Sequence, residues 1–284
     1  MNRSILVNEK DDGQEFPTKR RLFKYELANR GYVTLQTWVP PMLTLGVVLI
    51  VTEVVLLQMA VPTAVVPRPS LIFRALVNNL PQIWTHLRVT IAEALIGFAG
   101  GTITAVFTAI VFTIYKPAQR GLLPIVIALQ TVPVIVLAPI LALTLGNGMI
   151  SKSVVAGLIT FFPTVINMVR GLSSPSPLLF DLFTTLDATR LQVLFKLRLP
   201  ASMSYLFASL KIATANCFIG ALVAEWISAD RGAGYLMVIK MYQLETPMLY
   251  ATVFATSMAA IFFFRLVGSI EAWFLPWAVR REVE

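Results

Sequence analysis

Residues 175–200 read Pro-Ser-Pro-Leu-Leu-Phe-Asp-Leu-Phe-Thr-Thr-Leu-Asp-Ala-Thr-Arg-Leu-Gln-Val-Leu-Phe-Lys-Leu-Arg-Leu-Pro and lie between two long apolar runs. Ser176 can cap a helix, and Pro177 suits the first helical position because its missing N–H is not needed there. Apolar residues then recur at helical spacing between charged ones, and Pro200 ends the pattern. The stretch therefore predicts a short amphipathic helical pair between two membrane spans.

Two interpretations of this amphipathic pair are open at this point. It can lie on lipid headgroups as an interfacial element, because one face is apolar and the other is charged. It can also present its apolar ridge to a soluble partner outside the bilayer. The residues of the ridge are Leu182, Phe183, Leu186, Val193, Leu194 and Leu197.

The composition indicates an all-α integral membrane protein. Of the 284 residues, 57% are hydrophobic and only 13% are charged, whereas soluble domains carry about 25% charge. The apolar residues form long runs, as helices that span a bilayer require. The single Cys217 and the single His86 exclude an intrachain disulfide and a Cys/His zinc site.

The apolar runs predict a domain of six transmembrane helices over residues 38–272. The expected spans are about 40–60, 88–113, 121–145, 151–171, 203–228 and 247–270. Residues 61–81 read as an external loop with an interfacial helix at about 69–79, and 229–246 as a re-entrant or interfacial loop. Residues 1–37 are predicted to form a tail and a juxtamembrane segment, and 273–284 a second tail.

The basic residues orient this predicted bundle. Fifteen Lys and Arg residues lie in the two tails, the turn 115–120, the end of the fourth span and the loop 171–203, against six in the segments on the other side, so both termini and that loop are expected in the cytoplasm. The net charge of +8 then marks the inner leaflet, and nucleic acid is a poor candidate partner.

Polar residues within spans are candidates for a translocation pathway, because burying them in lipid is costly. Gln130, Asn216 and Glu225 are the candidates, although each can equally form a hydrogen bond between helices. The Pro residues of the third span, Pro133 among them, free backbone carbonyls that need other partners, which suits a helix lining a cavity. Glu93 and Glu225 lie near the outer ends of their spans, which disfavours a proton-coupled carrier.

Small residues repeat every four positions along the second span, at Gly97, Gly101 and Ala105. This spacing places them on one face and allows close approach of another helix, within the subunit or across a dimer. The sequence contains no Gly-x-x-x-x-Gly-Lys-Ser/Thr phosphate loop and no enzyme constellation, so it is not predicted to bind ATP or to be an enzyme.

The 175–200 stretch resembles the cytoplasmic coupling loop of binding-protein-dependent ABC importer permeases of the type I fold. Asp181 stands at the Glu position of the family pattern, Leu182 and Phe183 at its two Ala positions, Asp187 at its Gly position, and Leu199-Pro200 at its closing pair. Residues 130–139, 220–226 and 232–236 also resemble the subgroup that imports nitrate, bicarbonate, sulfonates, taurine or vitamin precursors. The resemblance covers about residues 66–272.

The resemblance also suggests a tight turn between two short helices at position 187. Asp tolerates positive φ better than most residues, and its carboxylate can cap a helix starting at Ala188. By resemblance the ATPase-coupling residues are Asp181, Leu182, Phe183, Leu186, Asp187, Ala188, Leu199 and Pro200.

The resemblance implies a transport subunit of the bacterial inner membrane. Two copies would pair, a cytoplasmic ATPase would bind ATP and Mg, and an extracytoplasmic binding protein would deliver a small solute. An ATPase-independent secondary transporter or channel, or a membrane scaffold, is the alternative. The solute stays open between small organic anions and vitamin precursors, and the weakly charged spans slightly favour a neutral or aromatic one.

Overall fold

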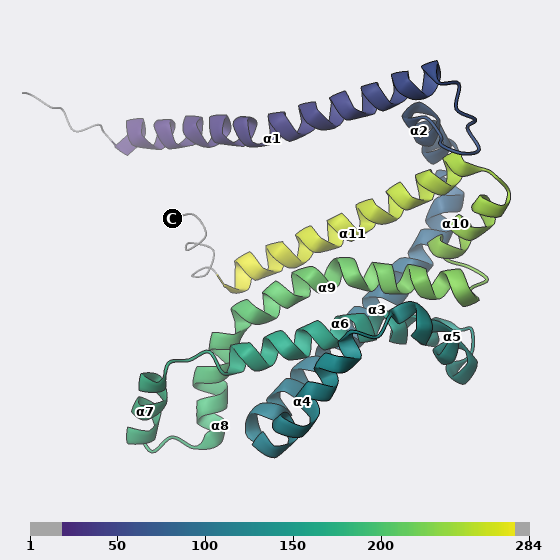
Figure 1. Ribbon diagram of the computed structural model, residues 1–284. Helices are drawn as coiled ribbons and strands as arrows, with labels where there is room; N and C mark the ends of the chain where they lie inside the picture. The colour runs from purple at the N-terminus through teal and green to yellow at the C-terminus, as the bar shows by residue number, and fades with distance from the viewer. Residues whose placement is uncertain (1–18, 276–284) are drawn as a thin grey trace, which may run out of the picture. The chain divides into compact units, whose positions relative to one another are not determined.

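A computed structural model describes residues 19–275, with side chains from residue 39 onward, so residues 1–18 and 276–284 of the two predicted tails lie outside the described residues. These residues form helices and no strand (Figure 1). The chain divides into two units, residues 1–60 and 61–284. The helices are α1 (Lys19–Gln58), α2 (Pro69–Asn78), α3 (Leu80–Ile114), α4 (Lys116–Gln130), α5 (Val134–Leu145), α6 (Met149–Leu172), α7 (Pro177–Thr185), α8 (Arg190–Val193), the π-helical turn η1 (Leu194–Arg198), α9 (Leu199–Ser228), α10 (Ala233–Tyr242) and α11 (Thr246–Phe274).

The first unit contains α1, a single helix of 40 residues. Its segment Val39–Gln58 is long and apolar enough to cross a membrane, which confirms the predicted first span. Pro40 and Pro41 lie inside the helix, so the helix begins well before the proline pair at which the predicted span starts.

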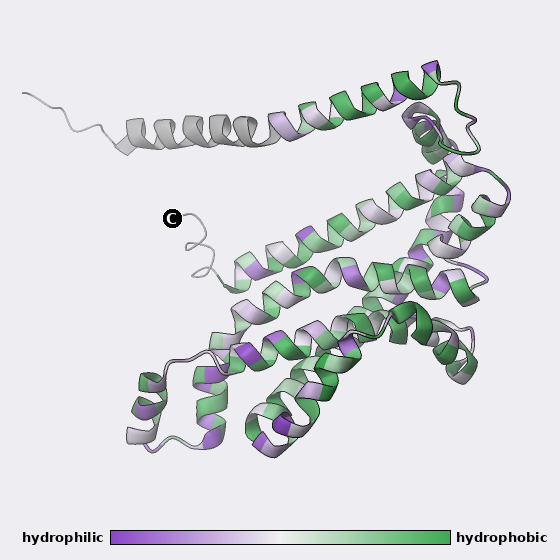
Figure 2. Ribbon diagram, viewed as in Figure 1, coloured by the Kyte–Doolittle hydropathy of each residue, from purple (hydrophilic) through white to green (hydrophobic). Residues whose placement is uncertain are grey.

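The core of the second unit is built from α3, α6 and α9, which contact one another, with α11 packed on α9 (Figure 1). All four helices are apolar over most of their length (Figure 2) and long enough to span. Gly97 and Gly101 of α3 are buried against Gly157 of α6. A Cβ on Gly101 would overlap the Gly157 carbonyl oxygen, so these backbones approach as closely as glycine allows.

The predicted third span, residues 121–145, is a pair of helices that bends sharply between them. α4 and α5 meet at an angle of 101° across Thr131–Pro133. Pro133 has no N–H to donate, and its ring disfavours a helical conformation at the residue before it. Pro124 and Pro139 lie inside α4 and α5 without ending them.

The predicted stop at Pro200 is wrong. A continuous helical segment runs from Arg190 to Ser228, through α8, η1 and α9. The N–H of Leu199 donates to the carbonyl of Leu194, five residues back, as a π-helical turn requires. This turn directly precedes Pro200, which has no N–H to donate, and its wider hydrogen-bond spacing lets the helix continue through the proline.

The two short helices of the loops agree with the sequence. α2 occupies the predicted interfacial segment at 69–79. α10 lies within 229–246 and has ten residues, half of what a span needs. The hydroxyl of Thr246 donates to the carbonyl of Thr63, which ties the start of α11 to the loop before α2.

Candidate functional site

The amphipathic pair predicted at 175–200 is present as α7 and α8 (Figure 1). Pro177 occupies the first turn of α7, and Ser176 precedes it without a side-chain cap bond. Leu178, Leu182 and Leu186 recur every four residues and are 76%, 51% and 67% exposed. We call these three side chains the α7 ridge.

Asp187 ends α7 in a Schellman motif. Its φ is +51°, which confirms the predicted positive φ at this position. The N–H of Asp187 donates to Thr184 O and the N–H of Ala188 to Phe183 O, both at 3.0 Å. The predicted cap by the Asp187 carboxylate is wrong, because α8 begins at Arg190 and is capped two residues later along the chain.

Thr189 caps α8 in a capping box. The N–H of Gln192 donates to Thr189 Oγ1 at 3.3 Å, and the N–H of Thr189 donates to Gln192 Oε1 at 2.7 Å. Together with the Schellman motif, these bonds satisfy the backbone on both sides of the turn. The α7–α8 pair is therefore a defined hairpin and not a loose loop.

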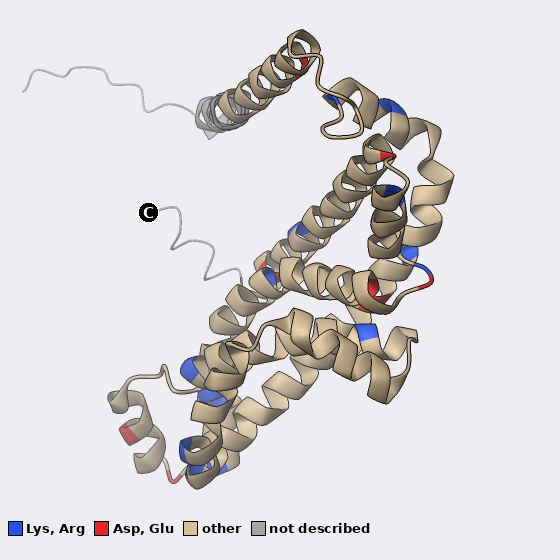
Figure 3. Cartoon of the chain, turned by 45° about the vertical axis from the view of Figure 1, so that its right-hand side comes forward, with Lys and Arg blue, Asp and Glu red and all other residues tan. Residues whose placement is uncertain are grey.

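Buried contacts and a backbone bond hold this hairpin to the core. Leu194 of η1 belongs to a buried cluster with α3 and α6, against which α4 also packs. The Arg198 guanidinium donates to Leu172 O at 3.2 Å and lies 4.7 Å from the Phe180 ring centroid. Basic residues gather at this end of the unit (Figure 3). Those of α4, α6, α8 and η1 are Lys116, Arg120, Arg170, Arg190, Lys196 and Arg198.

A polar cavity of about 320 Å³ lies between α4 and α6. Gln130, Asn167 and Arg170 line it together with apolar residues of the same two helices. Gln130, a predicted pathway residue, thus faces a cavity. Pro133 stands at the break between α4 and α5, and Asn216 is half-buried in α9.

At the opposite end of the unit, charged groups from three helices meet. Lys152 of α6 lies 3.8 Å from the Glu93 carboxylate of α3, and both side chains are almost fully buried. The Lys152 ammonium also donates to Asn147 O at 3.1 Å. The carboxyl groups of Glu93 and Glu225 interact, which brings α3 and α9 into the same cluster.

Glu225 fixes the turn between α9 and α10. Its carboxylate accepts from Thr90 Oγ1 at 2.7 Å and from the N–H of Gly234 at 2.5 Å. The Thr90 hydroxyl accepts in turn from the N–H of Ala233 at 2.8 Å. Gly232 has a φ of +115°, and a Cβ there would overlap the Glu225 carboxylate, so only glycine fits.

His86 completes the contacts to this turn. Its Nδ1 accepts from the N–H of Gly232 at 3.2 Å, and its ring stacks with Tyr235 at a centroid distance of 5.9 Å. The structure gives His86 one particular task, which is to orient the start of α10.

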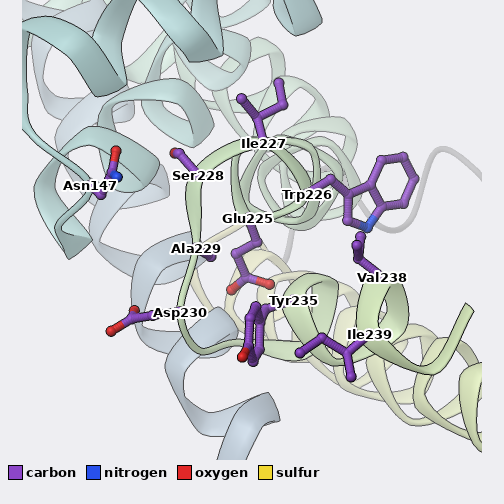
Figure 4. A pocket seen from close by; sticks show the side chains of 10 residues that line it. All are labelled: Asn147, Glu225, Trp226, Ile227, Ser228, Ala229, Asp230, Tyr235, Val238 and Ile239. Atoms are coloured by element: carbon purple, nitrogen blue, oxygen red, sulfur yellow. The ribbon is translucent and has the colours of Figure 1, made fainter. Parts of the chain in front are cut away.

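Glu225, Tyr235 and Asn147 also line a pocket of about 500 Å³ (Figure 4), which we call the α10 pocket. Glu225 and Tyr235 lie next to each other in it, and Asp230 lies on the side opposite to Trp226. A hydrogen bond from Arg231 lowers the pKa of Asp230. The ten lining residues are Asn147, Glu225, Trp226, Ile227, Ser228, Ala229, Asp230, Tyr235, Val238 and Ile239.

The predicted pathway residues are not brought together. Gln130 and Glu225 line separate cavities near opposite ends of the unit. Sequence reasoning missed Lys152 as the partner of Glu93, and it missed Tyr235 and Trp226 as lining residues. The resemblance of residues 220–226 and 232–236 to the family could have indicated this site, because the two runs contain Glu225 and the glycines that its carboxylate contacts.

Comparison with protein families matches residues 97–280 to the binding-protein-dependent transport system inner membrane component. The chain is a member of this family. The permease is 33% identical over 212 residues to the formylaminopyrimidine transport permease protein ThiX of Halalkalibacterium halodurans, covering 74% of this chain and 85% of the relative.

Two further relatives widen the range of solutes. The permease is 28% identical to the riboflavin transport system permease protein RibX of Chloroflexus aurantiacus, covering 76% of this chain and 81% of the relative. It is 25% identical to the taurine transport system permease protein TauC of Escherichia coli, covering 96% and 98%. The predicted resemblance to type I ABC importer permeases is thereby confirmed, and the permease is a multi-pass membrane protein and a transport subunit.

Proposed function

We propose that this permease is the transmembrane subunit of an ATP-driven importer in a bacterial inner membrane. Two copies form the translocation pathway, a separate ATPase binds ATP and Mg at the cytoplasmic face, and a binding protein delivers the solute outside. The observation that carries the proposal is the α7–α8 hairpin, which exposes the α7 ridge beyond the apolar helices.

The surroundings of the hairpin support a cytoplasmic docking role. Basic residues gather at this end (Figure 3), as expected for the inner side of a membrane. An exposed apolar patch bordered by polar residues is typical of a protein interface. The two ordered caps around Asp187 keep the ridge rigid, which an element that transmits movement needs.

The relatives support import of a small solute. Their names cover a formylaminopyrimidine, riboflavin and taurine, so both nitrogen heterocycles and sulfonates are open for this permease. The apolar spans bring few charged groups to the bundle, so the bundle as a whole does not decide between heterocycles and sulfonates.

Affinity purification in mild detergent from the native host tests the ATPase partner. We expect an ATPase with a phosphate-binding loop to copurify, and Leu182→Asp to abolish its association because the charge falls on the α7 ridge. Thr184→Asp is the matched control, since Thr184 is also exposed on α7 but two residues away, on the other side of the helix.

A secondary transporter would give a different result. The permease would then purify without an ATPase at any salt concentration, and uptake would persist after ATP depletion. Equal association of the Leu182→Asp and Thr184→Asp variants with an ATPase would show that the ridge is not the contact.

A further inference from the structure

The α10 pocket has the dimensions and the mixed lining of a small-molecule site. Its volume of about 500 Å³ lies within the range of about 300–1,000 Å³ that such sites show. We propose that it accepts a flat nitrogen heterocycle carrying N–H donors and rejects small sulfonates. This inference rests on the proposed function, because it names the class of solute that the importer carries.

Glu225 supplies the hydrogen-bond acceptor. Each carboxylate oxygen can accept two hydrogen bonds. One oxygen receives a bond from Thr90 and the other from the N–H of Gly234, and the carboxyl group also contacts that of Glu93, which leaves one acceptor position. Glu225 is also a lining residue, so acceptor capacity remains at the pocket. The same two bonds fix the carboxylate in place, and an amino group or ring N–H of a solute can complete its coordination.

The charges around the pocket disfavour an anion. Oxyanions are bound in proteins by Arg, Lys and N–H donors, but neither Arg nor Lys is among the ten lining residues. Lys152 and Arg231 lie nearby, and each is already paired with an acid, Glu93 or Asp230. A sulfonate would therefore meet the carboxyl groups of Glu225 and Asp230 without a cation to bind it.

The aromatic residues suit a flat ring. The Tyr235 ring is oriented by its stacking contact with His86, at an interplanar angle of 27°. Trp226 lines the same pocket and is 49% exposed, so its indole can contact a solute (Figure 4). Stacking of a heterocycle on an aromatic side chain strengthens binding by about 10- to 100-fold.

A lysine from the delivering protein is the competing occupant. Its ammonium would satisfy Glu225, but its narrow chain would leave the aromatic and aliphatic walls uncovered. The lining of Ile227, Val238 and Ile239 matches a ring better than a single alkyl chain. We therefore assign the α10 pocket to the solute and not to a lysine side chain.

Equilibrium binding to the full-length permease in lipid nanodiscs tests the inference. The probe is 4-amino-2-methylpyrimidine, compared with 2-methylpyrimidine, taurine and ethanesulfonate. We expect saturable binding of the aminopyrimidine, at least about 10-fold weaker binding without its amino group, and no binding of either sulfonate.

Two variants locate the probe. Glu225→Gln and Trp226→Ala should each weaken aminopyrimidine binding by about 10-fold or more. Glu245→Gln and Trp273→Ala are the matched controls, because both residues are exposed and neither lines the pocket. Trp226→Ala removes no bond of the α9–α10 turn, so it tests the site even if Glu225→Gln disturbs folding.

Several outcomes would overturn the inference. These are equal binding of taurine and the aminopyrimidine, no binding of any probe, or binding that both pocket variants leave unchanged. If no probe bound, and if Glu225→Gln abolished the stimulation of ATP hydrolysis by the delivering protein, the pocket would be assigned to a lysine of that protein. Copurification of the ATPase is measured separately. An ATPase that copurifies while no probe binds contradicts only the solute site, whereas the absence of an ATPase contradicts the proposed importer.

Discussion

The contact between α3 and α6 gives a sharp test of how the core is packed. A Cβ added at Gly101 would lie 3.0 Å from both Cα and C of Gly157 and would overlap its carbonyl oxygen. Carbon atoms in contact prefer about 3.5–4.0 Å, so the two helices must separate to admit the methyl group. A Cβ at Gly100, one residue earlier on the same helix, meets nothing within 4 Å.

The expected cost follows from comparing Gly101→Ala with Gly100→Ala. Both variants gain the same helix propensity, up to about 1 kcal/mol, because both replace glycine within α3. Only Gly101→Ala adds overpacking, which costs about 1–3 kcal/mol in a close-packed core. The difference in unfolding free energy between the two variants should therefore be about 1–3 kcal/mol, with Gly101→Ala the less stable.

Reversible unfolding in mixed micelles, followed by circular dichroism and by steric trapping, measures this difference. Gly100→Ala serves as the control for helix propensity and for the altered side-chain volume in lipid. If the two variants unfold within about 0.5 kcal/mol of each other, the close approach of α3 and α6 is not what holds the core together.

Four further predictions use the same unfolding assay or the assembled importer. Lys152→Met should destabilise the permease by about 3–5 kcal/mol, because it leaves Glu93 buried without its partner, and a compensating Glu93→Gln should restore part of the loss. Thr189→Ala should cost about 1 kcal/mol through the lost capping box, seen as faster proteolysis of the hairpin. Asp187→Gly should be neutral or stabilising and Asp187→Val destabilising by about 1–2 kcal/mol, because φ is positive there. Ile212→Pro, at an exposed position of α9, should leave ATPase association intact but reduce transport per ATP hydrolysed, as measured in proteoliposomes.

Local chemistry made part of this fold predictable. The long apolar runs locate the spans because a bilayer demands about 20 apolar residues per helix. The turn at position 187 was expected from the resemblance to the family pattern, and the tolerance of Asp for positive φ makes this sequence compatible with it. Both features depend on residues that are adjacent in the sequence, and the structure agrees with both.

The two proline positions were not predictable by the same reasoning. Pro133 breaks the α4–α5 pair, whereas Pro200 lies in the first turn of α9 and the helix continues. Membrane helices tolerate proline when neighbouring groups satisfy the freed carbonyls, so the outcome depends on packing. At Pro200 the π-helical turn absorbs the disruption, which no local pattern in the sequence signals.

The polar cluster was predictable only in part, because its partners are distant in the chain. Glu93 and Glu225 were correctly placed near the same end of their spans, but no pattern in the sequence indicates that Lys152 pairs with Glu93. Its burial depends on the close contact of α3 and α6, which the glycines permit. The α10 pocket likewise combines α9, α10 and the loop before α6.

The prediction for Ile212→Pro depends on one continuous connection between the two ends of the permease. The helical segment Arg190–Ser228 has 39 residues and so extends about 58 Å at 1.5 Å per residue. It begins at the hairpin and ends just beyond Glu225, whose carboxylate binds the backbone of α10. A displacement of the hairpin can therefore reach the α10 pocket along one unbroken helical segment, which bends where the π-helical turn precedes Pro200. The α4–α5 pair cannot serve in this way, because its 101° break interrupts the backbone hydrogen bonds that would transmit the movement. If Ile212→Pro left transport per ATP unchanged, the movement would have to pass through α6 and the contacts of Gly157 instead.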